Sequence, residues 1–349
     1  MQVKQNSKGG QRNLMKKKMG IGKRILGTLI LPVLMFLIMM AVCWANGKTY
    51  YGTVDMWKTL IVNITISTTC AMGIGLQFNN GRFDFSGGAV MLLAAIIGGN
   101  IAKNMNSNVV LFAVLCIVLC TLLSVGVAVL YAYGRLPVAI STITMALIYE
   151  AVTPLLYNGA GVNLIADMEI KKLALFPGVL IPFILAIVIY EFYKRFTLTG
   201  KQSELLKNNQ GAAVDIGINE KKNVILSYVF SGLLFGCATM VWASSTIKSA
   251  SFTSLSTVSD LFTNILPVFI GLALSKYCGE AIGTVMGAVT LNLMSYGLQA
   301  VLSAELGSAV SMVITGVFVF VFNIITTPYG SIITAWFEAR KRKGELKKV

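Results

Sequence analysis

Long apolar runs constrain this chain more than any other feature of its sequence. A helix needs about 20 apolar residues to cross the hydrocarbon core of a bilayer, and the chain contains enough apolar stretches for about ten such helices. A soluble domain of 349 residues that is 56% hydrophobic could not bury that much apolar surface. We therefore predict an all-α, polytopic transmembrane helical bundle of about ten spans. The predicted spans are roughly 25–45, 57–78, 85–101, 108–132, 137–157, 174–193, 223–247, 261–275, 281–303 and 308–326.

The distribution of basic residues predicts the orientation of these spans. The net charge is +15, but the lysines and arginines lie in the two tails and in loops between apolar runs. This placement argues against a nucleic-acid-binding surface. With ten spans and the N-terminus inside, the cytoplasmic segments hold 23 of the 29 basic residues and the outer segments hold six. Because cytoplasmic loops are enriched in lysine and arginine, we expect both termini to be cytoplasmic. The predicted divisions are a basic tail 1–24, a transmembrane domain 25–332 and a basic tail 333–349.

The sequence lacks the residues that most enzymes and metalloproteins use. It has no histidine, and its six cysteines form no CxxC pair, so we predict no metal site and no cofactor. It also lacks the GxxxxGK[ST] loop that holds the phosphates of ATP. HExxH and GxSxG motifs are absent as well. These absences make a membrane-embedded enzyme improbable, and any ATP-driven work would need a separate subunit.

Polar residues inside the apolar runs suggest a route for a solute. Ionisable residues are rare there, so the sequence offers little support for a carrier driven by protons or sodium. Hydroxyl and amide side chains are more frequent, and they suit a neutral solute rich in hydroxyl groups. For each of these polar side chains, the alternative explanation is an ordinary hydrogen bond between two helices. For Asp84, which precedes the third run, the alternative is a local ion pair with Arg82. The candidate pathway residues are Asp84, Ser86, Thr142, Thr144, Asn158 and Asn292.

Glycines spaced four residues apart predict close contacts between helices. The pairs are Gly232/Gly236 in the seventh run and Gly283/Gly287 in the ninth. Small residues at this spacing allow two backbones to approach closely in a bilayer. This pattern indicates a compact bundle and does not indicate a function.

The segment 194–222 is the only sizeable loop on the predicted cytoplasmic side. It is polar, and its centre, Ser203–Ile216, could form a short amphipathic helix between Gly200 and Gly217. An ordinary solvated loop is the alternative.

Three stretches of the sequence resemble one known family of membrane proteins. Residues 80–91, NGRFDFSGGAVM, are similar to the family's GGIDLSVGSVM, with Asp84, Ser86 and Gly88 at matching positions. Residues 135–149, RLPVAISTITMALIY, resemble RIPPFIVTLGMMLIY. Residues 208–219, NNQGAAVDIGIN, and 226–234, LSYVFSGLL, follow the family pattern over some 25 residues. The chain departs from the family at Asn79-Asn80, where glycines are usual, and lacks the second proline after Pro137.

The family that these three stretches resemble is the permease subunits of ABC importers for ribose, xylose and branched-chain amino acids. The resemblance implies a function and a set of partners. Such permeases are all-helical, have about ten spans, usually pair with a second permease copy and lie in the bacterial cytoplasmic membrane. A separate ABC ATPase binds their cytoplasmic loop, and an extracytoplasmic binding protein delivers the solute. A small sugar is the favoured cargo because the FDFS run is closer to the sugar permeases; nucleosides and branched-chain amino acids are the alternatives. The residues expected to contact the ATPase are Asn208, Asn209, Gln210, Gly211, Ala212, Ala213, Gly217 and Ile218.

Overall fold

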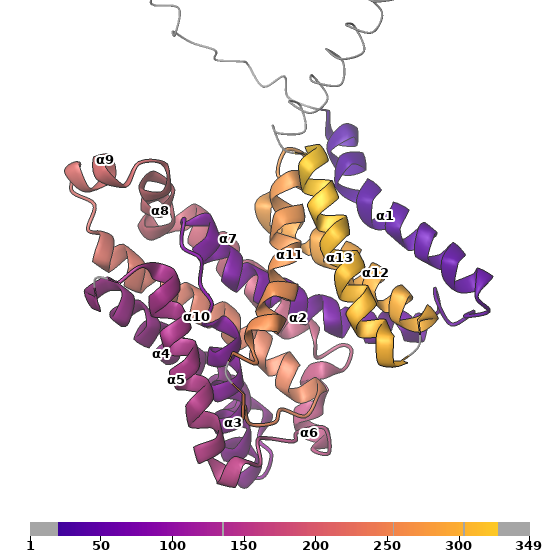
Figure 1. Ribbon diagram of the computed structural model, residues 1–349, viewed down its shortest axis with the longest axis horizontal. Coiled ribbons are helices and arrows are strands. Elements are labelled where there is room, and N and C mark those ends of the chain that lie inside the picture. The colour runs from indigo at the N-terminus through magenta and orange to yellow at the C-terminus, as the bar shows by residue number, and fades with distance from the viewer. Residues whose placement is uncertain (1–19, 135, 254, 303, 327–349) are drawn as a thin grey trace, which may run out of the picture.

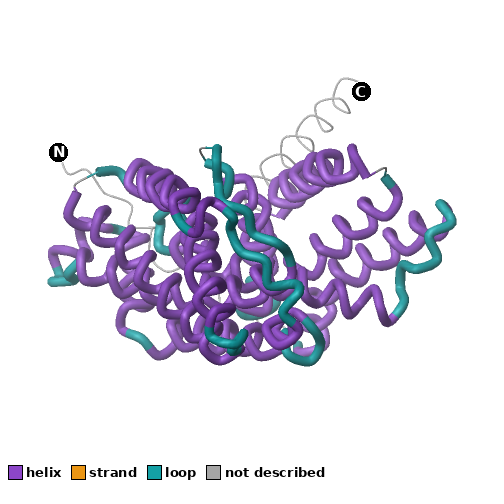
Figure 2. Tube along the Cα trace, turned by 90° about the horizontal axis from the view of Figure 1, so that it is seen from below, coloured by secondary structure: helices purple, strands orange, loops and turns teal. Residues whose placement is uncertain are grey.

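The computed structural model of the protein describes residues 20–134, 136–253, 255–302 and 304–326. These residues form helices joined by loops (Figure 2), and they contain no strand beyond one isolated bridge between Val162 and Lys248. The tail segments 1–19 and 327–349 and the residue Arg135 lie outside the described residues. The fold is therefore all-α, as the sequence predicts.

The predicted spans each overlap a helix of the structure. Within the described part of the chain, seven helices are long and apolar enough to cross a membrane. The remaining predicted spans coincide with α7, α11 and α13, of which α7 and α11 have 17 residues each. The count of ten spans thus stays a prediction. The matching helices are α1 (Ile21–Ala45), α2 (Val54–Asn79), α3 (Gly87–Asn104), α4 (Val109–Gly134), α5 (Val138–Val152), α7 (Leu180–Phe196), α10 (Glu220–Ser245), α11 (Val258–Leu274), α12 (Glu280–Val301) and α13 (Ala304–Thr326).

Helix α2 lies between the two sides of the bundle. In Figure 1, α3, α4, α5 and α10 lie on one side and α1, α11, α12 and α13 on the other. Helix α2 contacts α10 and α7 as well as α11 and α12, so it joins both sides. Short elements complete the fold: α6 (Met168–Lys171), α8 (Leu198–Asn208), α9 (Gln210–Asp215) and three 3-10 turns at Thr153–Leu155, Tyr157–Gly159 and Lys172–Ala174.

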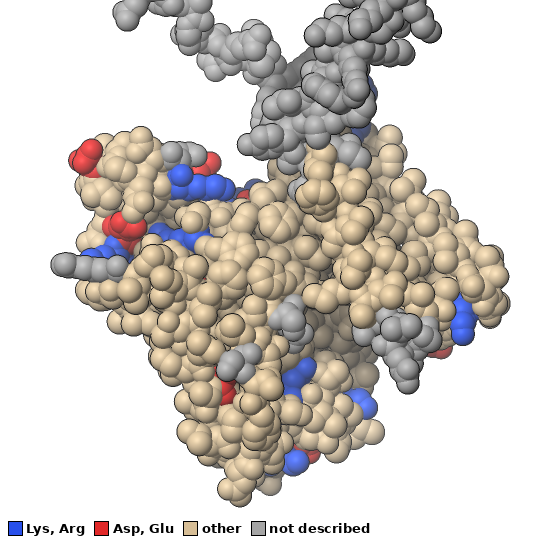
Figure 3. Space-filling model, viewed as in Figure 1, with Lys and Arg blue, Asp and Glu red and all other residues tan. Residues whose placement is uncertain are grey.

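The surface has the character of a protein embedded in a bilayer. Charged side chains gather toward opposite edges, and a broad band between them carries almost none (Figure 3). Helix α1 leaves most of its apolar side chains exposed, and α4 exposes an apolar stripe that includes Val110, Val114, Val118 and Leu122, which suits contact with lipid. The start of α1, the end of α13 and the pair α8–α9 lie along one edge (Figure 1). This placement agrees with cytoplasmic termini and a cytoplasmic loop, although the side that this edge faces stays a prediction.

The glycine pairs bring helices into close contact. A Cβ atom on Gly232 would lie 2.5 Å from Thr121 Cα of α4, and one on Gly236 would lie 2.7 Å from Ile117 Cα. Similarly, Gly283 and Gly287 of α12 face the backbone of α11. The predicted close packing is confirmed, because only glycine leaves room for these backbones.

Two helices begin inside the bundle. Residues 80–86 separate α2 from α3, and Ser86, which precedes α3, is 1% exposed. An irregular segment, 246–257, leads to α11, and Thr257 before it is also buried. The two helix starts touch, since a Cβ atom on Gly88 would lie 2.6 Å from Thr257 O. The fold therefore places two helix N-termini side by side within the bundle.

Candidate functional site

A polar cavity of about 370 Å³ is bounded by α2, the end of α10, α11, α12 and α13. None of the described residues that line it is acidic or basic. Four amides and two large aromatic side chains, Trp242 and Tyr296, contribute to its walls, together with several hydroxyl groups. The lining residues are Asn63, Ile66, Ser67, Trp242, Ser245, Thr246, Thr263, Asn264, Leu291, Asn292, Ser295, Tyr296, Gln299 and Thr315.

Helix α12 supplies a continuous polar face to this cavity. Asn292, Ser295, Tyr296 and Gln299 follow the spacing i, i+3, i+4 and i+7, which places them on one side of a helix. Asn292 Nδ2 donates to Ala288 O of the preceding turn at 2.8 Å, which helps to hold the amide in place. The hydroxyl oxygens of Ser295 and Thr315 lie 3.5 Å apart and join α12 to α13. The arrangement can exchange hydrogen bonds with a neutral polar molecule.

A small second cavity of about 20 Å³ adjoins the first. It shares Ile66, Trp242 and Asn264 with the larger one and reaches Gly88 and Thr257, where the starts of α3 and α11 meet. The contact between these two helix starts therefore lies close to the polar cavity.

Glu150 holds the start of α11 in this position. Its Oε1 accepts hydrogen bonds from Thr257 N at 2.8 Å and from Thr257 Oγ1 at 2.6 Å. The carboxyl is 2% exposed, and its Oε2 lacks a partner in the described part of the chain. A negative charge is favourable at a helix N-terminus, so Glu150 of α5 caps α11. Sequence analysis identified no role for it.

The predicted pathway residues lie in several parts of the fold. Asn292 lines the polar cavity. Thr142 is buried on α5, where its hydroxyl donates to Ala139 O, and Thr144 is exposed on the same helix. Asn158 is exposed in a turn with a φ of 55°. The structure does not bring these three residues to the cavity, and their part in a pathway stays a prediction.

Asp84 and Ser86 lie in the segment before α3. Asp84 Oδ1 accepts hydrogen bonds from Ser86 N at 2.8 Å and from Ser86 Oγ at 2.6 Å. Burial raises the pKa of the Asp84 carboxyl, and the two bonds from Ser86 partly oppose this shift. Arg82 forms none of the ion pairs among the described residues; it donates instead to Ser227 and Asn223. Asp84 thus shapes the start of α3 without an ion pair to Arg82.

The predicted amphipathic helix of the segment 194–222 is present as two helices. Asn209 interrupts it in an extended conformation with a φ of −157°, and its side chain caps α9 by accepting from Ala212 N at 3.1 Å. Leu206, Ala213 and Ile218 form a small buried cluster that holds α8 against α9. Gly217, with a φ of 93°, turns the chain after α9. The local sequence favours this break because an asparagine cap competes with a continuous helix.

The pair α8–α9 presents small and apolar side chains to the surface. Gly211 and Ala212 are exposed, and the apolar Val214 and Ile216 are 46% and 71% exposed. Among the predicted contact residues, Asn209, Gln210 and Gly217 are also exposed, whereas Ala213 and Ile218 are buried. The side chain of Asn208 lies outside those that the structure describes. This surface can accept a partner that approaches the α9 backbone.

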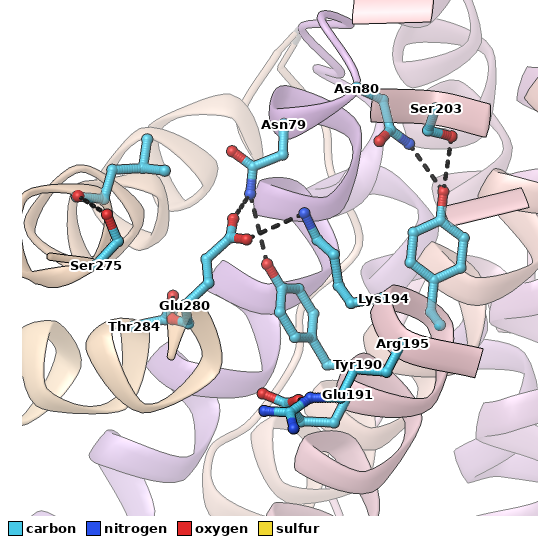
Figure 4. Close-up of polar contacts among 12 residues, drawn as sticks. Asn79, Asn80, Tyr190, Glu191, Lys194, Arg195, Ser203, Ser275, Glu280 and Thr284 are labelled. Carbon is cyan, nitrogen blue, oxygen red and sulfur yellow. Dashed lines mark hydrogen bonds and ion pairs between the residues drawn. The ribbon is translucent and has the colours of Figure 1, made fainter. Parts of the chain in front are cut away.

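A network of hydrogen bonds ties α8 to the bundle (Figure 4). Tyr193 of α7 lies at its centre, because its hydroxyl contacts Ser203 Oγ of α8 at 2.9 Å and accepts from Asn80 Nδ2 at 3.1 Å. Ser203 in turn donates to Asn223 Oδ1 of α10 at 3.0 Å. Asn223 also accepts from the Arg82 guanidinium at 3.2 Å. We call this set of five residues the polar junction.

Comparison with known proteins identifies the family. The protein family described as the permease component of the branched-chain amino acid transport system matches residues 56–322, which is most of the chain. The chain belongs to this permease family. The ribose import permease protein RbsC of Escherichia coli strain K12 is 25% identical over 272 residues, which cover 75% of this chain and 83% of that protein. RbsC of Escherichia coli O157:H7 matches equally well. No solved structure matches significantly.

Membership in this family of ABC importer permeases places ATP hydrolysis on a separate subunit and implies an ATPase and a substrate-binding protein as partners. It also explains the multi-pass membrane character of the fold. Within this permease, sequence reasoning identified Asn292 of the cavity but did not assign Trp242, Tyr296 or Gln299 to it. The polar spacing from Asn292 to Gln299 on one apolar helix was the signal that could have found two of them.

Proposed function

We propose that this chain is the permease subunit of an ABC importer that carries a small neutral sugar. The observation that supports this cargo is the polar cavity, because its described walls offer amides, hydroxyls and aromatic rings without a charged group. Amides and hydroxyls match the many hydroxyl groups of a sugar, and aromatic rings can pack against its apolar C–H faces. The similarity to a ribose import permease points in the same direction.

The alternative cargoes fit this cavity less well. A branched-chain amino acid carries an ammonium and a carboxylate, and burying charges without partners is costly. A nucleoside is neutral and remains the runner-up, since Trp242 or Tyr296 could stack on its base. An ion-coupled carrier needs carboxylates near its solute, and the described walls have none.

The partners follow from the same proposal. An ABC ATPase would dock on α8–α9, where Gly211, Ala212, Val214 and Ile216 are exposed. An extracytoplasmic binding protein would deliver the sugar at the opposite edge, and a second permease copy would complete the transporter in a bacterial cytoplasmic membrane. The cytoplasmic placement of α8–α9 and of both termini rests on the 23-to-6 distribution of basic residues.

Solute specificity can be tested in proteoliposomes. The permease, its ATPase and its binding protein would be reconstituted, and ATP-driven uptake of labelled pentoses, hexoses, a nucleoside and leucine would be compared. We expect uptake of one sugar and no uptake of leucine. Uptake of leucine or of the nucleoside alone would overturn the sugar assignment and leave the importer class intact. Uptake that needs an ion gradient and no ATP would overturn the class.

The orientation can be tested by cysteine labelling in intact cells. In a background without native cysteines, Asn106→Cys and Ala166→Cys should react with a membrane-impermeant reagent added from outside. Lys201→Cys, at an exposed position of α8, should react only after the membrane is opened. Labelling of Lys201→Cys from outside would reverse the proposed orientation.

A further inference from the structure

A groove with apolar walls runs between α1 and the first turns of α12. It has a volume of about 380 Å³ and is lined by residues of α1, of the turn from α11 to α12 and of α12. Ile25 and Leu29 of α1 and Ile282 of α12 contribute to its walls, and all three side chains are exposed. Arg24 is the only charged residue among the described residues that line it. Exposed apolar side chains therefore lie directly beside one cation.

A tight contact between α1 and the turn before α12 fixes one end of this groove. A Cβ atom on Gly27 of α1 would lie 2.5 Å from Tyr277 Cδ1, so the Tyr277 ring packs against the backbone of α1. Arg24 Nε donates a hydrogen bond to Tyr277 O at 3.0 Å. The remaining N–H donors of the guanidinium, on Nη1 and Nη2, have no partner among the described residues. Arg24 is thus held at the groove with donors available for a ligand.

Two further cations lie at the same end of the groove. Lys23 precedes Arg24 and is exposed. Lys276 is also exposed, and its Nζ lies 5.0 Å from the centre of the Tyr277 ring. The segment 1–24, which leads into α1, contains eight lysines and arginines and no aspartate or glutamate. We call Lys23, Arg24 and Lys276 the basic end of the groove.

The acidic residues near the basic end are already paired. Glu280 follows Gly279, which lines the groove, and forms an ion pair with Lys194. Glu191 Oε1 would lie 3.9 Å from a Cβ atom on Gly279, and Glu191 forms an ion pair with Arg195. Because these two carboxylates are each matched by a cation of α7, the basic end retains a net positive charge.

The groove opens where the charged edge of the protein meets its apolar surface. Helix α1 begins at the same edge as α8–α9 and runs along the outside of the bundle (Figure 1). Beyond Leu29, its exposed side chains stay apolar, as at Val33, Leu37 and Val42. A molecule in the groove would therefore meet positive charge at one end and apolar surface along its remaining length. Helix α1 lies outside residues 56–322, so the family match does not describe this groove.

We propose that the groove binds an anionic phospholipid of the bilayer, with its phosphate at the basic end and one acyl chain along Ile25, Leu29 and Ile282. Basic pockets between membrane helices are suited to anionic head groups, and the apolar walls are covered only by a ligand that has an apolar chain. A second copy of this chain in a symmetric contact would bring its own basic end into the same interface, which repulsion between like charges disfavours. The bound lipid joins α1 to α12.

Binding can be measured on the permease alone, whatever solute it carries. The full chain would be purified in a neutral detergent, and its melting temperature would be followed as lipid is added, because a ligand of the folded state raises it. We expect phosphatidylglycerol to raise the melting temperature with an apparent affinity about tenfold or more above that of phosphatidylcholine with the same acyl chains. Glycerol 3-phosphate, which carries the phosphate without acyl chains, should have no effect. Equal effects of the two lipids, or a rise with glycerol 3-phosphate alone, would overturn the assignment.

Charge variants test the basic end. Arg24→Gln should weaken the binding of phosphatidylglycerol about tenfold, which is the typical effect of one hydrogen bond to a charged group. Lys276→Gln should weaken it about fivefold. Lys201→Gln removes an equal charge at an exposed position of α8 and should leave the affinity unchanged. Equal affinities of Arg24→Gln and Lys201→Gln would show that the lipid does not bind at the basic end.

A substitution that keeps every charge tests the apolar part of the groove. Ile282→Trp fills the groove and leaves the basic end intact, so it should abolish the rise caused by phosphatidylglycerol. Val114→Trp is the matched control, because Val114 and Ile282 are both 50% exposed and α4 lies on the other side of the bundle (Figure 1). Normal binding by Ile282→Trp would show that surface charge alone attracts the lipid, and the groove would be excluded.

Photolabelling locates the lipid in the unmodified protein. Phosphatidylglycerol with a photoactivatable group in one acyl chain would be added to the purified permease, and the labelled peptides would be identified by mass spectrometry. We expect label on α1 and on the first turns of α12, and about tenfold less label there in Arg24→Gln. Label confined to other helices would contradict the proposed site.

Discussion

The polar cavity and the polar junction are both rich in hydrogen-bonding groups, but they differ in charge and in burial. The described walls of the polar cavity hold no acidic or basic group. The polar junction contains Arg82, which is 5% exposed, and the ion pair of Lys194 and Glu280 lies beside it. The uncharged region is the proposed solute route, and the charged region links α8 to the helices that line it.

The difference follows from what each region must do. A route through a membrane must attract a solute enough for entry and release it again, so neutral hydrogen bonds of modest strength are suitable. A connection between helices must transmit motion, so it needs stronger and more directional contacts. Hydrogen bonds to charged groups contribute about 1.5–3 kcal/mol, compared with about 1 kcal/mol for neutral ones. Charge therefore belongs to the connection and would hinder the route.

The largest effect on ATP-driven uptake is expected from substitutions at the surface of α9. Ala212→Glu or Gly211→Trp should abolish ATP-driven uptake, because each adds charge or bulk where a partner would approach the backbone. Both positions are exposed, and a Cβ atom on Gly211 would meet only Asn209 Oδ1 at 3.7 Å, so folding should be preserved. Co-purification of the ATPase and uptake in proteoliposomes would measure the effect.

A matched control for this prediction lies at the opposite edge. Ala160 is exposed in the loop after α5, and Ala160→Glu makes the same chemical change there. It should leave retention of the ATPase unchanged. Normal ATPase retention and normal uptake in Ala212→Glu and Gly211→Trp would show that α8–α9 is not the coupling element.

The next prediction tests whether uptake of the sugar depends on the absence of charge in the polar cavity. Asn292→Asp places a carboxylate in its wall with almost no change in volume, and we expect uptake of the sugar to fall about tenfold or more because a charge there lacks a partner. Asn292→Ala should have a smaller effect. Asn158→Asp, at the exposed predicted pathway position in the turn after α5, makes the same chemical change and serves as the comparison. If Asn158→Asp lowers uptake more than Asn292→Asp does, the cavity is not the route.

A third prediction concerns the contact between the starts of α3 and α11. Gly88→Ala would bring a methyl group to within 2.6 Å of Thr257 O, and overpacking of this kind typically destabilises a protein by about 1–3 kcal/mol. Gly316→Ala on α13 meets no atom within 4 Å and should stabilise the protein by about 0.5–1 kcal/mol. Thermal unfolding in detergent would compare the two. Equal melting temperatures would mean that the starts of α3 and α11 do not pack tightly.

The smallest effect on uptake is expected from substitutions of Asp84. Asp84→Asn retains an oxygen that can accept the bonds from Ser86, whereas Asp84→Ala removes both. We therefore expect Asp84→Ala to reduce uptake several-fold and Asp84→Asn to reduce it less. Unchanged uptake in both variants, with normal protein levels, would exclude a role for Asp84 in the route or its gate.

The sequence by itself determined the helices and their close contacts. Apolar runs must become helices in a bilayer because the backbone has no water to bond with, so the predicted spans match α1 to α5, α7 and α10 to α13 closely. The spacing of Gly232 and Gly236 predicted a helix contact because small residues four apart lie on one face. The polarity and charge of the segment 194–222 predicted a loop outside the apolar bundle, and its cytoplasmic placement stays a prediction.

Only the tertiary structure decided which polar residues meet. Asn63, Asn264 and Asn292 are far apart in the chain and share the cavity because α2, α11 and α12 pack together. Thr142 and Thr144 have similar side chains but lie on α5, away from it. The contacts of Glu280 with Lys194 and Asn79 likewise join three separate helices. Local sequence fixes which face of a helix is polar, and the packing of distant helices fixes what that face meets.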